Sequence, residues 1–380
     1  MKNMKTIYTL FLLVAAAFAQ SNAAPKAVNL ETGTDPHPQL VNAKVQTVDA
    51  SRGLRPVVDA LLKQQGPLWI GYVIPTERKE RTMCCFDNWN GSMVNGCCGG
   101  CKLENREGGF NVGRLDGANC NLEPADFAFV FLRAEGGKIT KTRAFSRDCA
   151  LDAAGLSVYW LTGVKAPESV ALLSGLVRAD DFDAEKGKHV GSQAILAIAI
   201  HNDPSVDVAL ESFLAPNMSR KIRQETAMWL GEERGEKGLA ILRRAIKSDS
   251  DERFREQALF GFTQAPNGAG LKDLLDLAKN DSSPKVRGQA IFWLAQAGSR
   301  KEGEAITAAI ENDPDTQVKE RAVFALSQMP ESEGVPLLIN VAKTNKNPAI
   351  RKKAIFWLGQ SKDPRGLQFL EEILFGTKSN

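Results

Sequence analysis

A repeat of 32 residues runs through most of the C-terminal half of the chain and limits the possible folds more than any other feature. Its six anchor residues are Val190, Ile222, Phe254, Val286, Val318 and Ile350. A small residue follows four positions later, alanine in five units and Thr226 in the other, and an aliphatic residue follows twenty positions later in all six. A period of this length is typical of a solenoid, whose units bury their apolar faces only against their neighbours.

Each unit is expected to contain two helices, because residues that cap helices precede both apolar segments. Ser283-Pro284 and Asn347-Pro348 place a capping side chain before an N-terminal proline at the first helix, and Asp203-Pro204 and Asp363-Pro364 do so at the second. A degenerate seventh unit is predicted ahead of the six, with its first helix at 157–163 and its second at 168–177.

The segments 282–298 (SSPKVRGQAIFWLAQAG) and 347–360 (NPAIRKKAIFWLGQ) resemble the short bacterial type of HEAT-like repeat. The resemblance extends over about residues 150–376. It implies an α-solenoid with an extended curved surface that holds other macromolecules. The predicted fold class is therefore mainly α, a HEAT-like α-solenoid of about seven helix pairs over 149–376, preceded by a small cysteine-rich α/β domain.

The N-terminal domain, 45–148, carries short and mixed signals. A helix is expected at 54–65 and a strand at 68–74, while the segments 127–133 and 139–145 flank a Gly-Gly turn and predict a β-hairpin. Residues 24–44 are rich in Pro, Thr, Asp and Asn without periodicity, so we predict a linker there.

The first 23 residues predict export. Lys2 and Lys5 precede an apolar run at 7–18, and small residues before Ala24 suit cleavage of a secretory signal peptide. An apolar run of this length is short of the roughly 20 residues that span a bilayer, so no membrane insertion is expected after cleavage. We therefore predict a periplasmic or secreted protein.

The charges are nearly balanced, which bears on the class of partner. The chain has 48 Lys and Arg against 45 Asp and Glu, a net charge of +3. This is not the basic excess of a nucleic-acid-binding protein. A protein or peptide partner is expected instead, held on the solenoid.

All seven cysteines lie in the N-terminal domain or at its end: Cys84, Cys85, Cys97, Cys98, Cys101, Cys120 and Cys149. Structural disulfides are the favoured interpretation, because exported domains with a modest core are commonly crosslinked. Metal binding and a redox pair at Cys98-Gly99-Gly100-Cys101 remain as alternatives. Three bridges would leave one thiol free, and a bridge from Cys149 would join the domain to the solenoid.

A row of basic residues stands one position after the anchors: Arg223, Arg255, Arg287, Lys319 and Arg351. They are candidates for an acidic partner, but the favoured interpretation pairs them with aspartates of the turns between units, which are Asp249, Asp251, Asp281, Asp313 and Asp315. Trp229, Trp293 and Trp357 recur in every second unit, and they predict a packed seam rather than a binding row.

Nothing in the sequence predicts an enzyme, a cofactor or a metal site. The acidic segment 178–189 departs from the calcium-loop pattern, and His189 and His201 lack the neighbouring glutamates of di-iron hydroxylases. The predicted function is an exported scaffold that binds a protein or peptide along its solenoid. The alternative is a thiol-redox or metal-binding module, formed by the cysteine-rich domain and presented by the solenoid.

Overall fold

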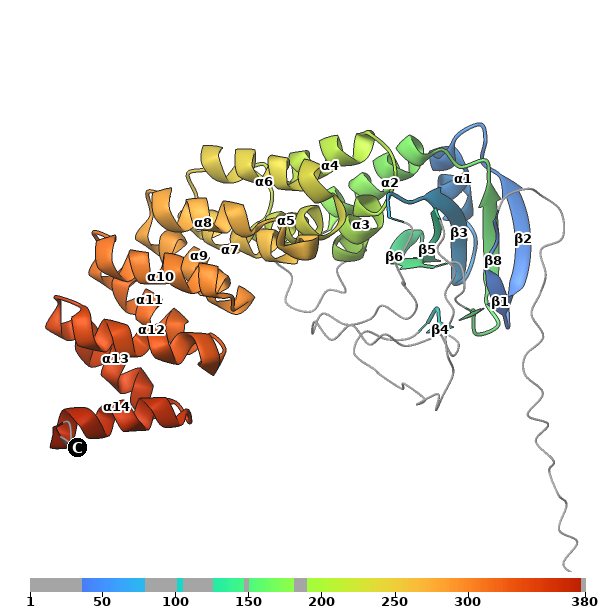
Figure 1. Cartoon of the computed structure of the whole chain (residues 1–380). Helices are drawn as coiled ribbons and strands as arrows, with labels where there is room; N and C mark the ends of the chain where they lie inside the picture. The colour runs from blue at the N-terminus through green and yellow to red at the C-terminus, as the bar shows by residue number, and fades with distance from the viewer. Residues whose placement is uncertain (1–35, 79–100, 105–125, 147–149, 181–189, 377–380) are drawn as a thin grey trace, which may run out of the picture.

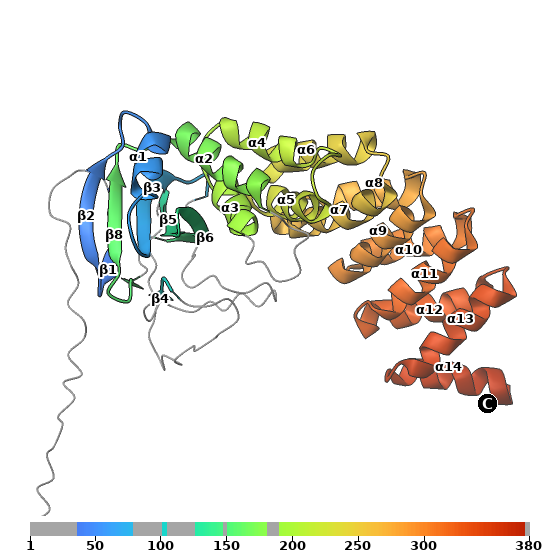
Figure 2. The same cartoon turned by 180° about the vertical axis from the view of Figure 1, so that it is seen from behind.

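The structure is a computed structural model that describes residues 36–78, 101–104, 126–146, 150–180 and 190–376. A sheet domain lies at one end and a curved array of helices extends from it (Figures 1 and 2). The predicted fold class, a mainly α solenoid behind a small α/β domain, is confirmed. Within the described residues, no helix has both the length and the apolar character needed to cross a membrane.

The sheet domain is built on a five-stranded sheet in the order β2-β8-β3-β5-β6. Its strands are β2 (Lys44–Asp49), β3 (Leu68–Pro75), β5 (Phe127–Glu135), β6 (Lys138–Phe145) and β8 (Ser157–Thr162), and helix α1 (Leu54–Leu61) follows β2. The hairpin β5–β6 is confirmed, with both turn glycines at positive φ. A small second sheet, β1 (Gln39–Val41), β7 (Ala150–Asp152) and β4 (Cys101–Lys102), lies beside it.

Strand β8 corrects the sequence-based prediction for 157–163, which is not a helix. β8 lies between β2 and β3, parallel to both. Its neighbouring residues Tyr159 and Trp160 are buried in two different apolar clusters, on opposite faces of the sheet. A strand buried on both faces is a continuous apolar run, which periodicity cannot distinguish from a buried helix.

Two predicted domain limits change with this result. The sheet domain continues past residue 149 through β7 and β8, and β1 lies inside the segment 24–44 that was expected to be a linker. The described helical array therefore begins after β8.

The array consists of one single helix followed by six helix pairs. The single helix is α2 (Ala166–Ala179), and the pairs are α3 (Val190–Ala199) with α4 (Ser205–Phe213), α5 (Arg220–Glu233) with α6 (Gly235–Ser248), α7 (Glu252–Gln264) with α8 (Leu271–Asn280), α9 (Pro284–Ala297) with α10 (Arg300–Asn312), α11 (Thr316–Ser327) with α12 (Glu331–Thr344), and α13 (Pro348–Gln360) with α14 (Pro364–Phe375). The predicted N-caps Ser283, Asn347 and Asp363 each accept backbone hydrogen bonds at the start of their helices. Helices α3, α5 and α7 line one side of the array and α4, α6 and α8 the other, after which the array bends through α9 to α14 (Figure 1).

A buried polar cluster joins the sheet to the first helices. Ser169 of α2 is hydrogen-bonded to Tyr72 of β3 at 3.0 Å and to Nε2 of His201 at 2.9 Å, and all three residues have no exposed surface. His201 Nδ1 lies 2.6 Å from the carbonyl oxygen of Ala197, to which it donates. Burial lowers the pKa of His201 to about 4, so the ring is neutral at pH 7.

Close backbone contacts set the spacing of the first helices. A Cβ atom built on Gly231 of α5 would lie 1.7 Å from the carbonyl oxygen of Gly261 on α7. Any side chain at Gly231 therefore forces the two helices apart, since real Cβ atoms do not approach an oxygen this closely. The small residues of the repeat allow the units to stack closely enough to bury their anchors.

Candidate partner-binding surface

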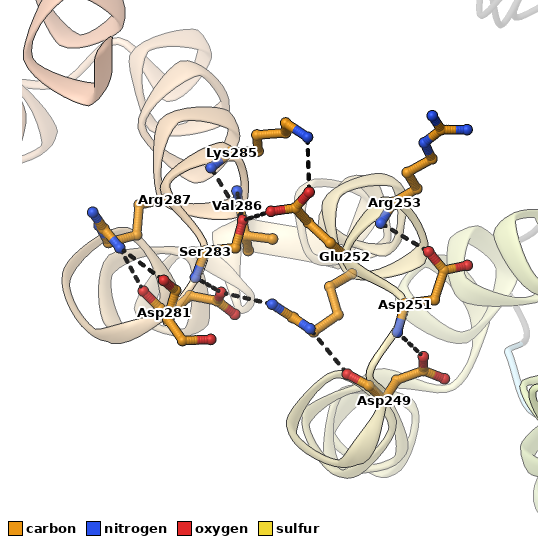
Figure 3. Close-up of polar contacts among 11 residues, drawn as sticks. Asp249, Asp251, Glu252, Arg253, Asp281, Ser283, Lys285, Val286 and Arg287 are labelled. Carbon is orange, nitrogen blue, oxygen red and sulfur yellow. Dashed lines mark hydrogen bonds and ion pairs between the residues drawn. The ribbon is translucent and has the colours of Figure 1, made fainter. Parts of the chain in front are cut away.

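The basic row predicted from the sequence lies inside the array at three of its positions. Arg223, Arg255 and Arg287 pair with Asp249, Asp281 and Asp313, the aspartates 26 positions further along. Their side chains are only 3%, 12% and 9% exposed. We call these six residues the Arg–Asp ladder; part of it is drawn in Figure 3.

Each arginine of the ladder connects two successive turns. Arg287 donates to both carboxylate oxygens of Asp313, at 2.8 and 2.9 Å, and to the carbonyl oxygen of Asp281 at 2.9 Å. Arg255 donates in the same way to the Asp249 carbonyl oxygen at 3.0 Å. The hydrogen bond to Asp313 raises the pKa of the Arg287 guanidinium above its usual value. These arginines therefore hold the units together, and they do not form an exposed binding row.

Within the part of the chain that the structure describes, the two remaining basic residues donate to backbone carbonyl groups and form no ion pair. Lys319 donates to the carbonyl oxygen of Glu311, and Arg351 to that of Asn345, at 2.9 and 2.8 Å. Asn345 occupies the turn position at which the ladder has an aspartate. The Arg–Asp ladder thus ends before the last unit. Among the described residues, an exposed surface for a partner must therefore be formed by other side chains of the first helices.

A continuous row of aromatic side chains crosses the last four units. The ring centroids of Phe260 and Trp293 are 5.3 Å apart, those of Phe292 and Phe324 6.5 Å, and those of Phe324 and Trp357 5.0 Å. All of these rings are partly exposed. Phe356, which also contacts Trp357, is 54% exposed. The seam predicted for the tryptophans is present at Trp293 and Trp357, where it is also an accessible apolar strip, whereas Trp229 is 7% exposed and belongs to the apolar core.

A glutamine stands four residues after each phenylalanine of this row, on the same side of its helix. The pairs are Phe260 with Gln264, Phe292 with Gln296, Phe324 with Gln328, and Phe356 with Gln360. Gln264 is partly exposed, whereas Gln296, Gln328 and Gln360 are exposed. We call the four pairs, together with Trp293 and Trp357, the Phe–Gln face. From the sequence, the phenylalanines were expected to pack between units and only the tryptophans were candidates for a binding row, although the glutamines recur in the same 32-residue register.

A cavity of about 250 Å³ opens at the last two units of the Phe–Gln face. Its apolar lining residues are Leu326, Met329, Val335, Leu338 and Trp357. The polar ones are Ser327, Gln328, Glu331, Gln360 and Ser361. They come from α11, α12, α13 and the turns that follow α11 and α13. The volume of the cavity suits one side chain rather than a whole cofactor, since pockets for small molecules measure roughly 300–1,000 Å³.

The structure also brings together a serine and a histidine that the sequence left apart. Ser169 and His201 are in hydrogen-bond contact, as a nucleophile and its base would be. Neither has exposed surface, so no substrate reaches them, and their contacts are those of a polar core between sheet and helices.

The other predicted site residues are only partly described. Six of the cysteines, Cys84, Cys85, Cys97, Cys98, Cys120 and Cys149, and the segment 181–189 lie outside the described residues. The backbone of Cys101 lies in β4, beside Leu151 of β7. Across the part of the chain that is described, no group of three or more His, Cys, Asp and Glu residues could hold a metal ion. The disulfide pairing, the free thiol and the redox or metal alternatives stay predictions.

Comparison with known proteins agrees with the helical arrangement. Residues 303–378 match the family model of HEAT repeats. The match covers α11 to α14 and most of α10, so it confirms the HEAT-like resemblance for this part of the chain. No curated protein sequence matches the chain.

Solved structures with similar arrays belong to proteins of different activities. The complex of CpcE and CpcF of phycocyanin lyase from Nostoc sp. PCC7120 is 19% identical, with a TM-score of 0.31, over 42% of this chain and 100% of that chain. Human deoxyhypusine hydroxylase is 14% identical, with a TM-score of 0.24, over 56% and 92%. Kap121p is 12% identical, with a TM-score of 0.33, over 55% and 27%. At these values none of the three indicates a function for this chain.

Proposed function

We propose that the protein is an exported scaffold that binds an extended segment of a protein or peptide along the Phe–Gln face. The observation that carries the proposal is the recurrence of Phe and Gln, four residues apart, in four successive units. HEAT-like arrays typically hold protein partners, and their concave or lateral surfaces are long enough for an extended chain.

The chemistry of the two residue types supports a peptide ligand. A glutamine amide carries both donors and an acceptor, so it can pair with the N–H and C=O groups of a peptide backbone. The rings beside it supply apolar contact that does not depend on one particular sequence. Neighbouring packed helices lie about 8–10 Å apart, and three residues of a polyproline II chain advance by about 9 Å. One glutamine per unit therefore suits one contact per three residues of an extended ligand.

The cavity at Trp357 supplies selectivity. The Phe–Gln face can hold a backbone, while Leu326, Val335 and Leu338 in the lining of the cavity offer apolar contact to a side chain of the ligand. The proposed ligand is thus an extended segment with an apolar residue near the end that lies over α11 and α13.

The experiment compares two triple variants in capture of partners from the native secretome, followed by affinity measurement with the captured peptide. One variant changes Gln296, Gln328 and Gln360 to alanine. The matched control changes Gln224, Gln317 and Gln368, which are also exposed but lie outside the Phe–Gln face. Three lost hydrogen bonds correspond to about 2–4 kcal/mol. We expect the first variant to lose at least tenfold in affinity and the control to bind normally; equal binding by both refutes the proposal.

Export, and a separate role for the cysteine-rich domain, rest on the sequence alone. The signal sequence at 1–23 motivates export, and N-terminal sequencing of the protein from its native host tests it, with a mature start at Ala24 expected. No enzymatic activity is part of the proposal.

A further inference from the structure

We propose that two copies of this chain associate through the outer face of the last unit, with α13 of one copy packed against α14 of the other. This terminal face consists of Lys352 and Phe356 on α13 and of Leu367, Leu370, Glu371 and Leu374 on α14. Phe356, Leu367 and Leu374 are 54%, 61% and 75% exposed. Ile373 and Phe375 add further exposed apolar surface beside it.

Two apolar residues of this face, Leu367 and Leu374, stand at positions that are buried in several preceding units, whereas the position of Phe356 is partly exposed in the preceding units. Leu374 corresponds in the 32-residue register to Leu214, Ile246, Ala278, Ile310 and Ala342, none of which is more than 8% exposed. Leu367 corresponds to Leu239 and Val335, which are 0% and 3% exposed. The unit formed by α13 and α14 therefore carries on its outer face residues of the kind that the preceding units bury, whereas capping repeats carry polar residues there.

Contacts inside the array show that these positions face the following unit. Gly303 corresponds to Leu367, and a Cβ atom built on it would lie 2.6 Å from a side-chain atom of Leu337 in the next unit. Phe324, which corresponds to Phe356, contacts Trp357 of the next unit. A partner on the terminal face would thus occupy the place that the next unit takes at every internal junction.

The two charged residues of the terminal face, Lys352 and Glu371, also stand at positions whose equivalents contact the next unit. Arg243 stands at the position of Glu371 and pairs with Asp273 of the next unit, with its Nη2 atom 3.0 Å from a carboxylate oxygen. Glu320 stands at the position of Lys352 and pairs with Lys353 of the next unit at 3.0 Å. Within the described residues, neither Lys352 nor Glu371 takes part in an ion pair. Both are placed for a partner beyond the last unit.

A second copy fits this face because its two charges are of opposite sign and lie on different helices. A two-fold axis that places α13 over α14 of the partner brings Lys352 of each copy to Glu371 of the other, in two equivalent pairs. The other end of the array cannot serve instead, because the sheet covers it: Thr142 of β6 donates a backbone hydrogen bond to Gln193 of α3 at 3.0 Å. The proposed association therefore gives a dimer and no larger assembly.

The size of the patch supports the same conclusion. Five large apolar side chains, each at least half exposed, present on the order of 600 Å² per copy on and beside the terminal face. A standard interface buries about 800 Å² per partner, so these side chains could supply most of one, and the largest apolar patch on a monomer, about 300–600 Å², is often functional.

The test is the mass of the purified full chain in sedimentation equilibrium over a range of concentrations. We expect twice the mass of one chain for the wild type. L374E places a carboxylate in the apolar contact, and its dissociation constant should rise at least about tenfold. V208E is the matched control, because Val208 on α4 is 71% exposed but lies far along the array, and it should associate normally. A monomeric wild type, or equal loss in both variants, overturns the proposal.

Charge reversal tests the geometry without touching the apolar contact. K352E and E371K should each weaken self-association, since like charges then meet at both pairs. A mixture of the two variants should form a mixed pair, in which both contacts are complementary again. Failure of the mixture to associate refutes the two-fold arrangement. Both substitutions lie outside the Phe–Gln face, but Phe356 belongs to both faces. Ligand binding at Gln296 and Gln328, which lie in the two preceding units, therefore reports separately on the proposed function.

Discussion

Removal of Asp313 is the perturbation that tests the Arg–Asp ladder most sharply. Its carboxylate accepts two hydrogen bonds from Arg287, and the two side chains are 6% and 9% exposed. Asp313→Ala leaves a buried guanidinium with only backbone oxygens as partners. Breaking a buried ion pair from one side costs about 3–5 kcal/mol, and two charge-assisted hydrogen bonds give a similar figure.

The neighbouring pair of Lys285 and Glu252 serves as the control, since Lys285 lies two residues before Arg287 on α9 and joins this helix to α7 of the preceding unit (Figure 3). Its atoms lie 2.8 Å apart, but the side chains are 58% and 36% exposed. An exposed pair contributes about 0–1 kcal/mol, so Lys285→Ala should change stability little. Replacing both ladder partners, as Arg287→Met with Asp313→Leu, should cost less than Asp313→Ala alone, because no buried charge is left unpaired.

The assay is urea denaturation followed by circular dichroism, combined with hydrogen exchange of the helices. Repeat arrays lose stability locally, so the exchange of α9 to α12 should accelerate most in Asp313→Ala. A loss no larger than that of Lys285→Ala, or acceleration spread evenly over the array, would show that the ladder does not hold the units together.

Three further predictions concern the packing, the pH dependence and the cysteines. Gly231→Ala should destabilise the array by about 1–3 kcal/mol in urea denaturation, because the added methyl group overpacks the contact between α5 and α7. Gly359 stands at the same position of the last unit, and a Cβ atom built on it would lie 3.8 Å from the nearest atom, on Leu370. Gly359→Ala should therefore be neutral or slightly stabilising. Burial raises the pKa of Glu225 from 4.5 to about 7, so the contribution of this residue to the free energy of unfolding falls as the pH rises between these two values. Glu225→Gln should therefore be more stable than the wild type at pH 8, by up to about 3 kcal/mol, and similar to it at pH 4. An equal difference at both pH values would contradict this. Peptide mapping without reduction should find Cys149 in a disulfide with another cysteine of the N-terminal domain, and a wholly free Cys149 would remove that prediction.

The array could be predicted from the sequence because every unit repeats the same spacing of apolar and small residues. An anchor, a small residue and an aliphatic residue at fixed spacing define two helices and their common core. The pairing of the ladder arginines with turn aspartates also followed from residue type and position. These features depend on contacts between one unit and the next, which recur along the chain.

The sheet domain was harder to predict because its strands are brought together from distant parts of the sequence. β8 lies between β2 and β3, although about 80 residues separate it from β3 along the chain. Its apolar run suits a buried strand and a buried helix equally well, and only the neighbouring strands decide between them. Ser169, Tyr72 and His201 are likewise far apart in the sequence, so no local sequence pattern predicts that they come into contact.

The Phe–Gln face was missed for a different reason. Each of its residues is ordinary in its own helix, and a half-buried phenylalanine usually belongs to a core. Only the exposed fraction of Phe356 and of the glutamines, together with the cavity at Trp357, distinguishes a surface from a seam. The signal lies in the register of the repeat and not in any single unit.

The central claim is that a partner lies along the Phe–Gln face, and a hydrogen-exchange footprint of the complex tests it most directly. The protein is compared with and without a partner captured from the native secretome. We expect protection at the C-terminal halves of α7, α9, α11 and α13 and at Gln328 directly after α11, where the Phe and Gln pairs lie, and unchanged exchange in α4, α6 and α8. Protection confined to the second helices of the units, or to the sheet domain, would contradict the account.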